Sequence, residues 1–250
     1  MKTVIISDLH LQASRPELTA LAFSLLDNIA KHCDELYILG DLFEYWLGDD
    51  ACDTTATEVA HRLNGLKQQN VAISIMHGNR DFLLGNQYVN SFGGQLLNAD
   101  TITLDIANKK TLLMHGDTLC TDDSQYQFYR RMVRNSGWQN DFLAKSISER
   151  EATARMIRST SKAHGHRAHT EKIADINLDT FEEAVTCNGV ERVIHGHTHR
   201  PGSHQHAVSG ATVERLVLGD WHTDYAVIAV CDNDTCELMI WNGNSLSPFS

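Results

Sequence analysis

Five short clusters of polar residues, each directly after an apolar run, constrain the fold of this chain more than any other feature of its sequence. The apolar runs are Thr3 to Ser7, Leu36 to Leu39, Val71 to His77, Thr111 to Met114 and Val193 to His195. Their length and composition are typical of buried strands. In open α/β sheets the ligand crevice lies beyond the carboxyl ends of the strands, so clusters at five strand ends can meet at one place. The pattern therefore predicts one polar site built from distant parts of the chain.

The clusters contain side chains that bind metal ions, and the pattern predicts seven ligands. These are Asp8, His10, Asp41, Asn79, His115, His195 and His197. In the Asp-x-His and His-x-His pairs, we expect side chains two residues apart to share one side of an extended chain, so that one strand end presents two ligands. Seven donors are too many for one tetrahedral zinc ion, but they suit two ions about 3.5 to 4 Å apart with a bridging carboxylate.

We assign the bridging carboxylate to Asp41. One ion is then expected to bind Asp8, His10, Asp41 and His197, and the other Asp41, Asn79, His115 and His195. These mixed donors are compatible with manganese, iron or zinc. Such a pair of ions can activate a water and hold phosphoryl oxygens for in-line displacement, which indicates a phosphoesterase. A single Asp-x-His is usually a turn or cap motif, but five clusters in this order favour a metal centre.

Two further histidines lie close to these clusters and have other interpretations. His77 lies inside a predicted strand, where a core histidine with a satisfied hydrogen bond is expected. His199 follows His197 and is expected to support the ligands through hydrogen bonds.

Helical patterns between the apolar runs predict a layered α/β fold. Pro16 opens a segment whose apolar residues recur at spacings of three and four, the pattern of a helix that buries one face. Those residues are Leu18, Leu21, Leu25 and Ile29. Thr55 to Gln69 and Asp179 to Asn188 are further predicted helices. Strands that alternate with helices favour an α/β architecture.

The tail is predicted to contain three consecutive strands, Thr212 to Leu218, Tyr225 to Val230 and Thr235 to Trp241, with turns at Gly219-Asp220 and Asn233-Asp234. We expect these strands to form a meander that completes a second sheet. The predicted fold is a single α/β domain over residues 1–250, in which two sheets pack face to face between helices.

A basic, helical segment interrupts this alternation, and we interpret it as an inserted cap over about residues 122–175. Residues 126–172 hold ten of the 21 lysines and arginines but four acidic residues, in a chain whose net charge is −11. That net charge argues against a nucleic-acid surface over the whole molecule. The cap is either a solvated helical face or a cover for an anionic, acylated substrate. In the second case, apolar residues would hold acyl chains and basic residues would reach phosphates or anionic lipid headgroups.

The sequence predicts neither a signal peptide nor a membrane span. The first apolar run is too short for a signal peptide, and no stretch has eighteen uninterrupted apolar residues. The cysteines show no paired metal or redox spacing, so we expect free thiols in the cytoplasm. They are Cys33, Cys52, Cys120, Cys187, Cys231 and Cys236.

The five clusters, taken in order, resemble those of the calcineurin-like metallophosphoesterase family over residues 1 to about 120 and 190 to 225. That family has an Asn-His pair in its third cluster, where this chain has Asn79-Arg80. In this departure the chain resembles the branch of the family that hydrolyses UDP-2,3-diacylglucosamine in lipid A synthesis. The similarity to that branch runs almost end to end. The strings that carry it are YILGDLFE at 37–44, GNRDFLLG at 78–85 and MHGDTLCTDD at 114–123.

The resemblance implies a two-sheet metallophosphoesterase sandwich with a helical cap insertion. It implies cleavage to UMP and 2,3-diacylglucosamine 1-phosphate by water attack on the uridine-side phosphorus, usually with two manganese ions. Catalytic roles fall to Asp41, Asn79 and Arg80. The residues implied in substrate binding are Asn79, Arg80, Asp123, Ser161, Arg167 and His195. Peripheral attachment to the cytoplasmic face of the inner membrane is also implied, without nucleic acid or an obligate protein partner.

Arg80 is expected to neutralise a leaving phosphate rather than to donate a proton. Arginine stays protonated at any relevant pH and is therefore a poor acid. A phosphate leaving group, whose second pKa is about 6, can depart unprotonated near neutral pH. The planar guanidinium suits the oxygens of such a group. The alternative for Arg80 is a surface ion pair with Asp81.

Other interpretations stay open for the cap and for the whole chain. A third metal ion at His164, His166 and His169 is the less favoured interpretation of the histidines in the cap. For the chain as a whole, one alternative is a phosphoesterase for a soluble nucleotide, such as a dinucleoside polyphosphate or a cyclic nucleotide. The other is a non-catalytic scaffold on the same fold.

Overall fold

Two β-sheets pack face to face in the computed structural model of this chain. The structure describes residues 2–170 and 175–249, with side chains described for all of these except 159–170. Within those residues, the first sheet contains, in spatial order, β12 (Leu246–Pro248), β11 (Cys236–Trp241), β10 (Ala226–Cys231), β1 (Thr3–Ile6), β2 (Glu35–Ile38), β3 (Ala72–Met76) and β4 (Gln95–Leu97). The second contains β5 (Thr101–Ile106), β6 (Lys109–Met114), β7 (Arg192–His195), β9 (Ala211–Val217) and β8 (Gly202–Val208). The strands β1 to β4 are parallel, and so are β6, β7 and β9.

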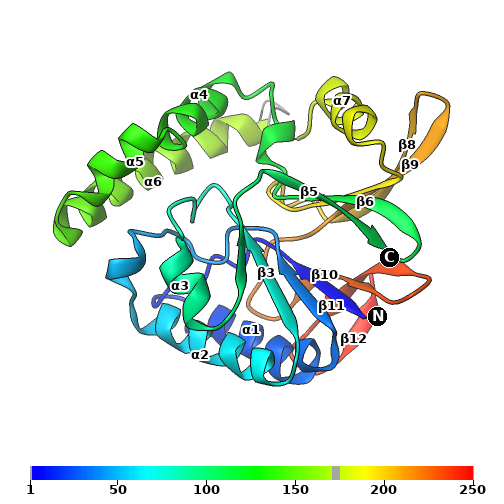
Figure 1. The fold of residues 1–250 in the computed structure, drawn as a ribbon. Coiled ribbons are helices and arrows are strands. Elements are labelled where there is room, and N and C mark those ends of the chain that lie inside the picture. The colour runs from blue at the N-terminus through cyan, green and yellow to red at the C-terminus, as the bar shows by residue number, and fades with distance from the viewer. Residues whose placement is uncertain (1, 171–174, 250) are drawn as a thin grey trace.

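Helices cover the outer face of each sheet (Figure 1). The first sheet is covered by α1 (Pro16–Asn28), α2 (Thr54–Gln68) and α3 (Asn86–Ser91), and the second by α7 (Leu178–Asn188). Short 3-10 helices join these elements at η1 (Ala30–His32), η2 (Asp49–Ala51) and η3 (Asp117–Leu119). Pro16 opens α1, which buries Leu18, Leu21 and Leu25 as predicted, and Asp53 caps α2 by accepting a hydrogen bond from the backbone N–H of Ala56.

Separate apolar clusters fill the spaces between these layers. Side chains of α1 and α2, such as Leu25 and Leu63, pack against the first sheet. Ile5, Leu113 and Ile194 belong to the cluster between the two sheets. Phe181 of α7 belongs to the cluster on the outer face of the second sheet. The expected sandwich flanked by helices is therefore confirmed.

Three helices, called here the helical cap, lie together beside the sandwich (Figure 1). They are α4 (Ser124–Val133), α5 (Ser136–Leu143) and α6 (Ile147–Thr170). Most of the cap arginines whose side chains are described bind the body of the protein. Arg130 pairs with Asp117 at 2.7 Å, and Arg158 pairs with Glu44 at 2.5 Å. These basic residues therefore fasten the cap, rather than forming a uniformly solvated face.

Arg150 fixes the start of α6 in the same way. Its side chain is 6% exposed and donates hydrogen bonds to both carboxylate oxygens of Asp50 and to the backbone carbonyl of Leu47. None of the described helices combines the length and apolar character that crossing a membrane requires.

The prediction of a three-stranded meander in the tail is wrong. β9 lies in the second sheet between β7 and β8, whereas β10 pairs with β1 and β11 in the first sheet. The connection at residues 218–225 therefore crosses from one sheet to the other. Trp221, which is 2% exposed, anchors it by donating its indole N–H to the carbonyl of Ser7. Strand patterns alone cannot distinguish a hairpin from a crossover, because both consist of strand, turn and strand.

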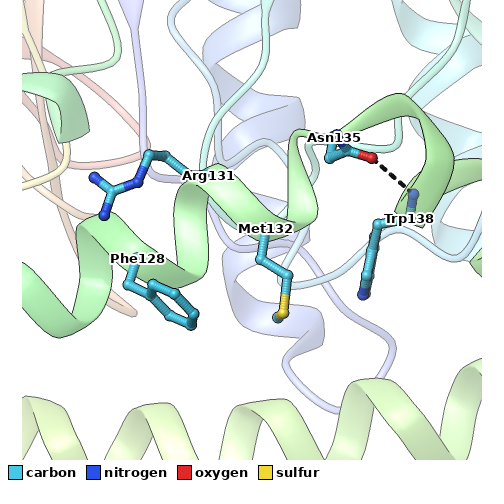
Figure 2. Close-up of a pocket in the computed structure, with 5 residues that line it drawn as sticks. All are labelled: Phe128, Arg131, Met132, Asn135 and Trp138. Carbon is cyan, nitrogen blue, oxygen red and sulfur yellow. Dashed lines mark hydrogen bonds between the residues drawn. The ribbon is translucent and has the colours of Figure 1, made fainter.

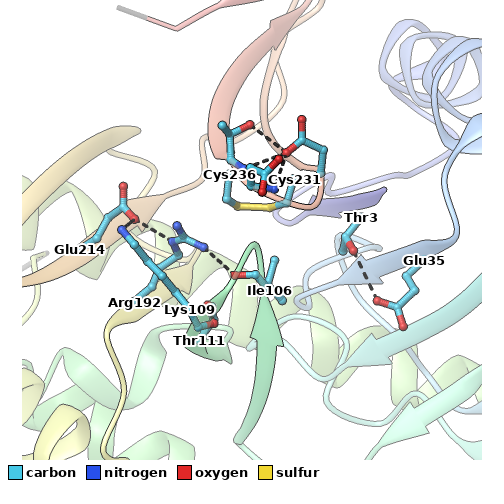
Figure 3. The surroundings of a disulfide bond; sticks show 12 residues. Thr3, Glu35, Ile106, Lys109, Thr111, Arg192, Glu214, Cys231 and Cys236 are labelled. Atoms are coloured by element: carbon cyan, nitrogen blue, oxygen red, sulfur yellow. Dashed lines mark hydrogen bonds and ion pairs between the residues drawn. A yellow bond between two sulfur atoms is a disulfide. The ribbon is translucent and has the colours of Figure 1, made fainter. Parts of the chain in front are cut away.

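The expectation that all the cysteines are free is also wrong. Cys231 and Cys236 form a disulfide across the β10–β11 hairpin, where they face each other in the strand register (Figure 3). Cys33, Cys52, Cys120 and Cys187 are free. A separation of five residues does not identify Cys231 and Cys236 as a pair in the sequence. Their side chains meet only once the chain folds back through a four-residue turn.

Candidate metal centre

The predicted ligands lie at the carboxyl ends of parallel strands from both sheets. Asp8 and His10 follow β1, Asp41 follows β2, and Asn79 follows β3. His115 comes directly after β6. His195 is the last residue of β7, and His197 follows it. The two sheets thus present their polar ends on the same edge of the sandwich.

The expectation that the Asp-x-His and His-x-His pairs lie on extended chain is wrong. Asp8, His10, Asp41, His197 and His199 have φ angles of 48° to 66°, in the left-handed region, so these segments are not extended. Non-glycine residues seldom adopt this conformation, although Asp and His tolerate it better than most. Backbone strain of this kind is common where a functional site over-determines the chain. Here it turns each segment sharply after the strand and directs the side chains to one point.

Asn79 lies at the centre of one group of donors. Its Oδ1 is 2.9 Å from His115 Nε2 and 2.8 Å from His197 Nδ1. His115 Nε2 is also 3.8 Å from Asp41 Oδ2, while its Nδ1 hydrogen-bonds to the carbonyl of Leu39 at 2.8 Å. That carbonyl fixes the ring so that Nε2 faces the other donors.

Asp8, His10 and His199 form a second group. His199 Nε2 is 3.3 Å from Asp8 Oδ1 and 3.4 Å from His10 Nε2. Glu44 lies behind His10, with its carboxylate 3.2 Å from Nδ1, so that Nε2 of His10 points toward Asp41 at 3.8 Å. His199 thus contacts the predicted ligands Asp8 and His10, in the position expected for a supporting residue.

His195 is placed differently from the other predicted ligands. It is fully buried, its Nδ1 hydrogen-bonds to the carbonyl of Gly196, and its Nε2 lies 3.4 Å from Nη1 of Arg215. Its neighbour Gly196 contacts the centre, because a Cβ added there would lie 2.1 Å from Asp8 Oδ2. His195 therefore lies beside the metal-type donors, but its two ring nitrogens contact other groups, namely the Gly196 carbonyl and the Arg215 guanidinium.

Asp81 is buried and hydrogen-bonded to the backbone, which excludes the surface ion pair between Arg80 and Asp81. Its carboxylate is 1% exposed and accepts hydrogen bonds from the backbone N–H groups of Gly78 at 2.9 Å and of Leu42 at 2.8 Å. It also accepts one from the N–H of Asp41 at 3.2 Å. Asp81 therefore holds the β2 and β3 end segments together.

Burial and charge set the protonation of the donors. Burial lowers the pKa of His195 to about 4 and of His197 to about 3, which leaves both rings neutral near pH 7. Burial raises the pKa of Asp41 above its ordinary value. Burial opposes charge on His115 as well, but Asp41 and Asp8 raise its pKa in net. The raised pKa of His115 thus favours a proton on that ring beside the buried carboxylates.

These residues fit a centre for divalent cations. Ligand atoms of Asp8, Asp41 and His115 lie within 4.8 Å of one another, and so do those of Asp8, His10 and His199. Asp8 Oδ1 is buried and has no hydrogen-bond partner among the residues that the structure describes, although His199 Nε2 is 3.3 Å away. A cation among these atoms would satisfy the carboxylate and replace the proton on His115, as metal binding generally does.

Two of the predicted substrate contacts, Arg80 and Asp123, have described interactions at the centre and at the start of the cap. The backbone N–H of Arg80 donates to Asp41 Oδ1 at 2.7 Å, while its buried Nε makes no hydrogen bond within the described residues. Asp123 caps α4 by accepting a hydrogen bond from the N–H of Tyr126 at 2.9 Å. The side chains of Ser161, Arg167 and the three cap histidines lie outside the described residues.

Sequence reasoning missed supporting residues that touch the centre. Glu44 belongs to a recognised cluster, but no role was assigned to it. Asp220 has its Oδ2 3.6 Å from Nδ1 of His199, and the sequence signal there was a predicted turn. Arg215 gave no signal at all, because a basic residue inside a strand is not a typical metal-site feature.

Replacement of Gly78 by alanine tests how tightly the centre is packed. A Cβ at this position would lie 2.0 Å from Asp41 Oδ1 and 2.3 Å from the Asp41 backbone nitrogen, so Asp41 must move. We expect Gly78→Ala to lower hydrolysis of a phosphodiester by about a hundredfold, the loss typical of a 1 Å misplacement, with reduced metal content by elemental analysis. Gly65→Ala in α2 is the matched control, because nothing lies within 4 Å of its added Cβ. Equal activity of the two variants would contradict this packing.

Comparison with known proteins agrees with this geometry. A family model described as calcineurin-like phosphoesterase matches residues 1–201, which include the five clusters. The chain belongs to this family. The phosphoesterase is 45% identical over 222 residues to a UDP-2,3-diacylglucosamine hydrolase of Cellvibrio japonicus, covering 89% of this chain and 92% of that relative. It is 42% identical over 239 residues to the hydrolase of the same name from Serratia proteamaculans, covering 96% and 98%.

Membership confirms the family resemblance seen in the motifs. The phosphoesterase is thus a hydrolase of a family that uses divalent metal ions. The assignment of each ligand to one of two ions remains a prediction.

Proposed function

We propose that this phosphoesterase hydrolyses UDP-2,3-diacylglucosamine to UMP and 2,3-diacylglucosamine 1-phosphate. The observation that carries the proposal is an apolar cavity in the helical cap next to the candidate metal centre. Support also comes from relatives named for this substrate that align with about nine tenths of the chain. A soluble nucleotide would have no use for such a cavity.

The cavity has a volume of about 360 Å³ and is lined by α4 and α5 (Figure 2). Its lining residues are Phe128, Arg131, Met132, Asn135 and Trp138. The side chains of Phe128, Met132 and Trp138 point to the same side of these helices (Figure 2). Phe128 is 66% exposed, and Met132 is 41% exposed. Apolar side chains left this exposed within a cavity suit acyl chains, which would cover them.

The cavity adjoins the segment that carries Asn79 and Arg80. Trp138 lies 6.0 Å from Phe82 between ring centroids. Arg134, the C-cap residue of α4, lies over the same Phe82 ring and donates a hydrogen bond to the carbonyl of Gly78 at 2.9 Å. An acylated sugar in the cavity would therefore have its phosphate close to Arg80.

The chain's own residues have separable tasks in the proposed reaction. The donors at the strand ends would hold the divalent ions, and Arg80 neutralises the phosphate that leaves toward the cap. A pair of divalent ions, when bound, supplies activation of the attacking water and neutralisation of the phosphoryl oxygens. Glu44, whose pKa is lowered to about 2 by His10, Arg80 and Arg158 against the cost of burial, keeps a negative charge behind His10.

We further propose manganese as the metal and peripheral binding to the cytoplasmic face of the inner membrane. Carboxylate, amide and imidazole ligands are compatible with manganese. Arg131 and Lys145 are exposed and can contact anionic lipid headgroups, while the exposed apolar residues Phe128 and Leu143 can contact acyl chains. A substrate with two acyl chains resides in a membrane, so an enzyme that extracts it needs such contact.

One assay tests the proposed function. The metal-loaded protein is given UDP-2,3-diacylglucosamine and, separately, unacylated UDP-GlcNAc, in water enriched in ¹⁸O. We expect hydrolysis of the acylated substrate to exceed that of UDP-GlcNAc by at least about a hundredfold in kcat/KM, because the buried acyl chains contribute binding at roughly 0.8 kcal/mol per methylene. Solvent oxygen should appear in UMP.

Other results of this assay favour other functions. Equal rates for the two substrates would favour a phosphoesterase for soluble nucleotides. Label in the sugar phosphate would contradict attack on the uridine-side phosphorus. The absence of any turnover would favour the scaffold.

A further inference from the structure

The proposed substrate has a nucleoside as well as an acylated sugar, and the structure offers a second surface for it. This inference rests on the proposed function. If the sugar and its acyl chains occupy the cap, the ribose and base must extend from the same phosphorus to another part of the rim.

A row of side chains runs from the cap across the metal centre to this second surface. It begins at Arg158 of α6, which pairs with Glu44, and Glu44 in turn contacts His10. His10 lies 3.4 Å from His199, and His199 lies 3.6 Å from the Asp220 carboxylate. The row therefore ends in the crossover connection at residues 218–225, at the opposite end from α6.

The last members of the row are an exposed, stacked pair of rings. Asp220 Oδ1 is 3.7 Å from Nε2 of His222, whose ring stacks on Tyr225 with centroids 4.5 Å apart and planes 17° apart. The His222 side chain is 48% exposed and Tyr225 is 36% exposed. Trp221 anchors the same connection to the end of β1 through hydrogen bonds to Ser7 and Asp8. The pair is thus held at a fixed place beside the centre.

The order of groups along this row matches the order of groups in a nucleotide. The metal centre suits the phosphate, and the carboxylate of Asp220 can accept hydrogen bonds from ribose hydroxyls, as acidic residues do in nucleotide sites. Aromatic faces stack on nucleobases. We propose that His222 and Tyr225 form the platform on which the uracil base stacks, with Asp220 bound to the ribose.

A binding experiment on the metal-loaded protein tests this platform without turnover. The two ligands are UMP and ribose 5-phosphate, which lacks the base. We expect the wild type to prefer UMP by about tenfold in Kd, the size of one base–aromatic stack. Tyr225→Ala and His222→Ala should lose most of this preference while keeping their affinity for ribose 5-phosphate. Tyr225→Phe, which keeps the ring, and His204→Ala, which removes an exposed histidine from β8, should retain it.

Two results would overturn the platform. One is a wild-type protein that binds the two ligands equally, and the other is a full preference for UMP in both alanine variants. If the alanine variants do not fold, nuclear Overhauser effects between the uracil protons of UMP and a tyrosine ring in the wild type decide the matter. Absence of these effects with bound UMP contradicts the stack. Failure to hydrolyse the acylated substrate would instead overturn the proposed function, and it leaves this measurement unaffected.

Discussion

His115→Ala is expected to abolish most of the activity and to lower the metal content of the purified protein. His115 is 2% exposed, and its Nε2 faces both Asn79 at 2.9 Å and Asp41 at 3.8 Å. Its removal deletes a donor and leaves a buried gap beside Asp41, the predicted bridging carboxylate. We expect a fall in turnover of about a thousandfold, beyond the 10- to 100-fold loss typical of residues that support a ligand. Elemental analysis after dialysis measures the metal, and hydrolysis of the acylated substrate measures the activity.

The matched control for this variant is His61→Ala on the exposed side of α2. It removes a histidine of the same chain without touching the centre, so metal content and turnover should stay at wild-type values. A His115→Ala protein with full metal content and wild-type turnover would contradict the placement of His115 in the metal centre.

Arg80→Ala is expected to lower turnover steeply while leaving the metal content unchanged. The guanidinium is not a metal ligand, and the backbone N–H that donates to Asp41 at 2.7 Å survives the substitution. The positive charge near the leaving phosphate is lost. We expect a fall in kcat of roughly 100- to 1,000-fold, the effect of removing one group that stabilises charge in a transition state.

Arg80→Lys separates charge from shape. Lysine restores the positive charge without the planar fork, so its turnover should lie between those of the wild type and Arg80→Ala. Wild-type turnover in Arg80→Ala would show that the leaving phosphate departs without help from this residue. Loss of metal in the same variant would mean that Arg80 acts on the structure of the centre.

Much of the architecture followed from local patterns. Apolar runs such as Thr3 to Ile6 and Val193 to His195 are strands because their short, β-branched sequences suit burial on both faces. The spacing of apolar residues in α1 predicts a helix, because it places them together on one buried face. Metal-type residues at the ends of these runs marked the edge on which the site would form, since parallel strands end at a common edge.

These local patterns do not predict which strands pair with each other or which cysteines meet. The tail strands were recognised, but β9 and β10 belong to different sheets. The disulfide between Cys231 and Cys236 depends on the register of one hairpin. Register and sheet membership arise from packing against partners distant in sequence, so a local reading carries no information about them.

By itself, the sequence determined the family, the chemical class of the site and the identity of its predicted donors, because these depend on residue types in a fixed order along the chain. Tertiary structure alone decided how the donors converge. Left-handed turns at Asp8, Asp41 and His197 aim the side chains, and Asp81 ties two strand ends together through backbone N–H groups. It also decided which groups surround the centre, such as Glu44 and Asp220. Such contacts join residues far apart in the chain, and their geometry exists only after the two sheets have packed.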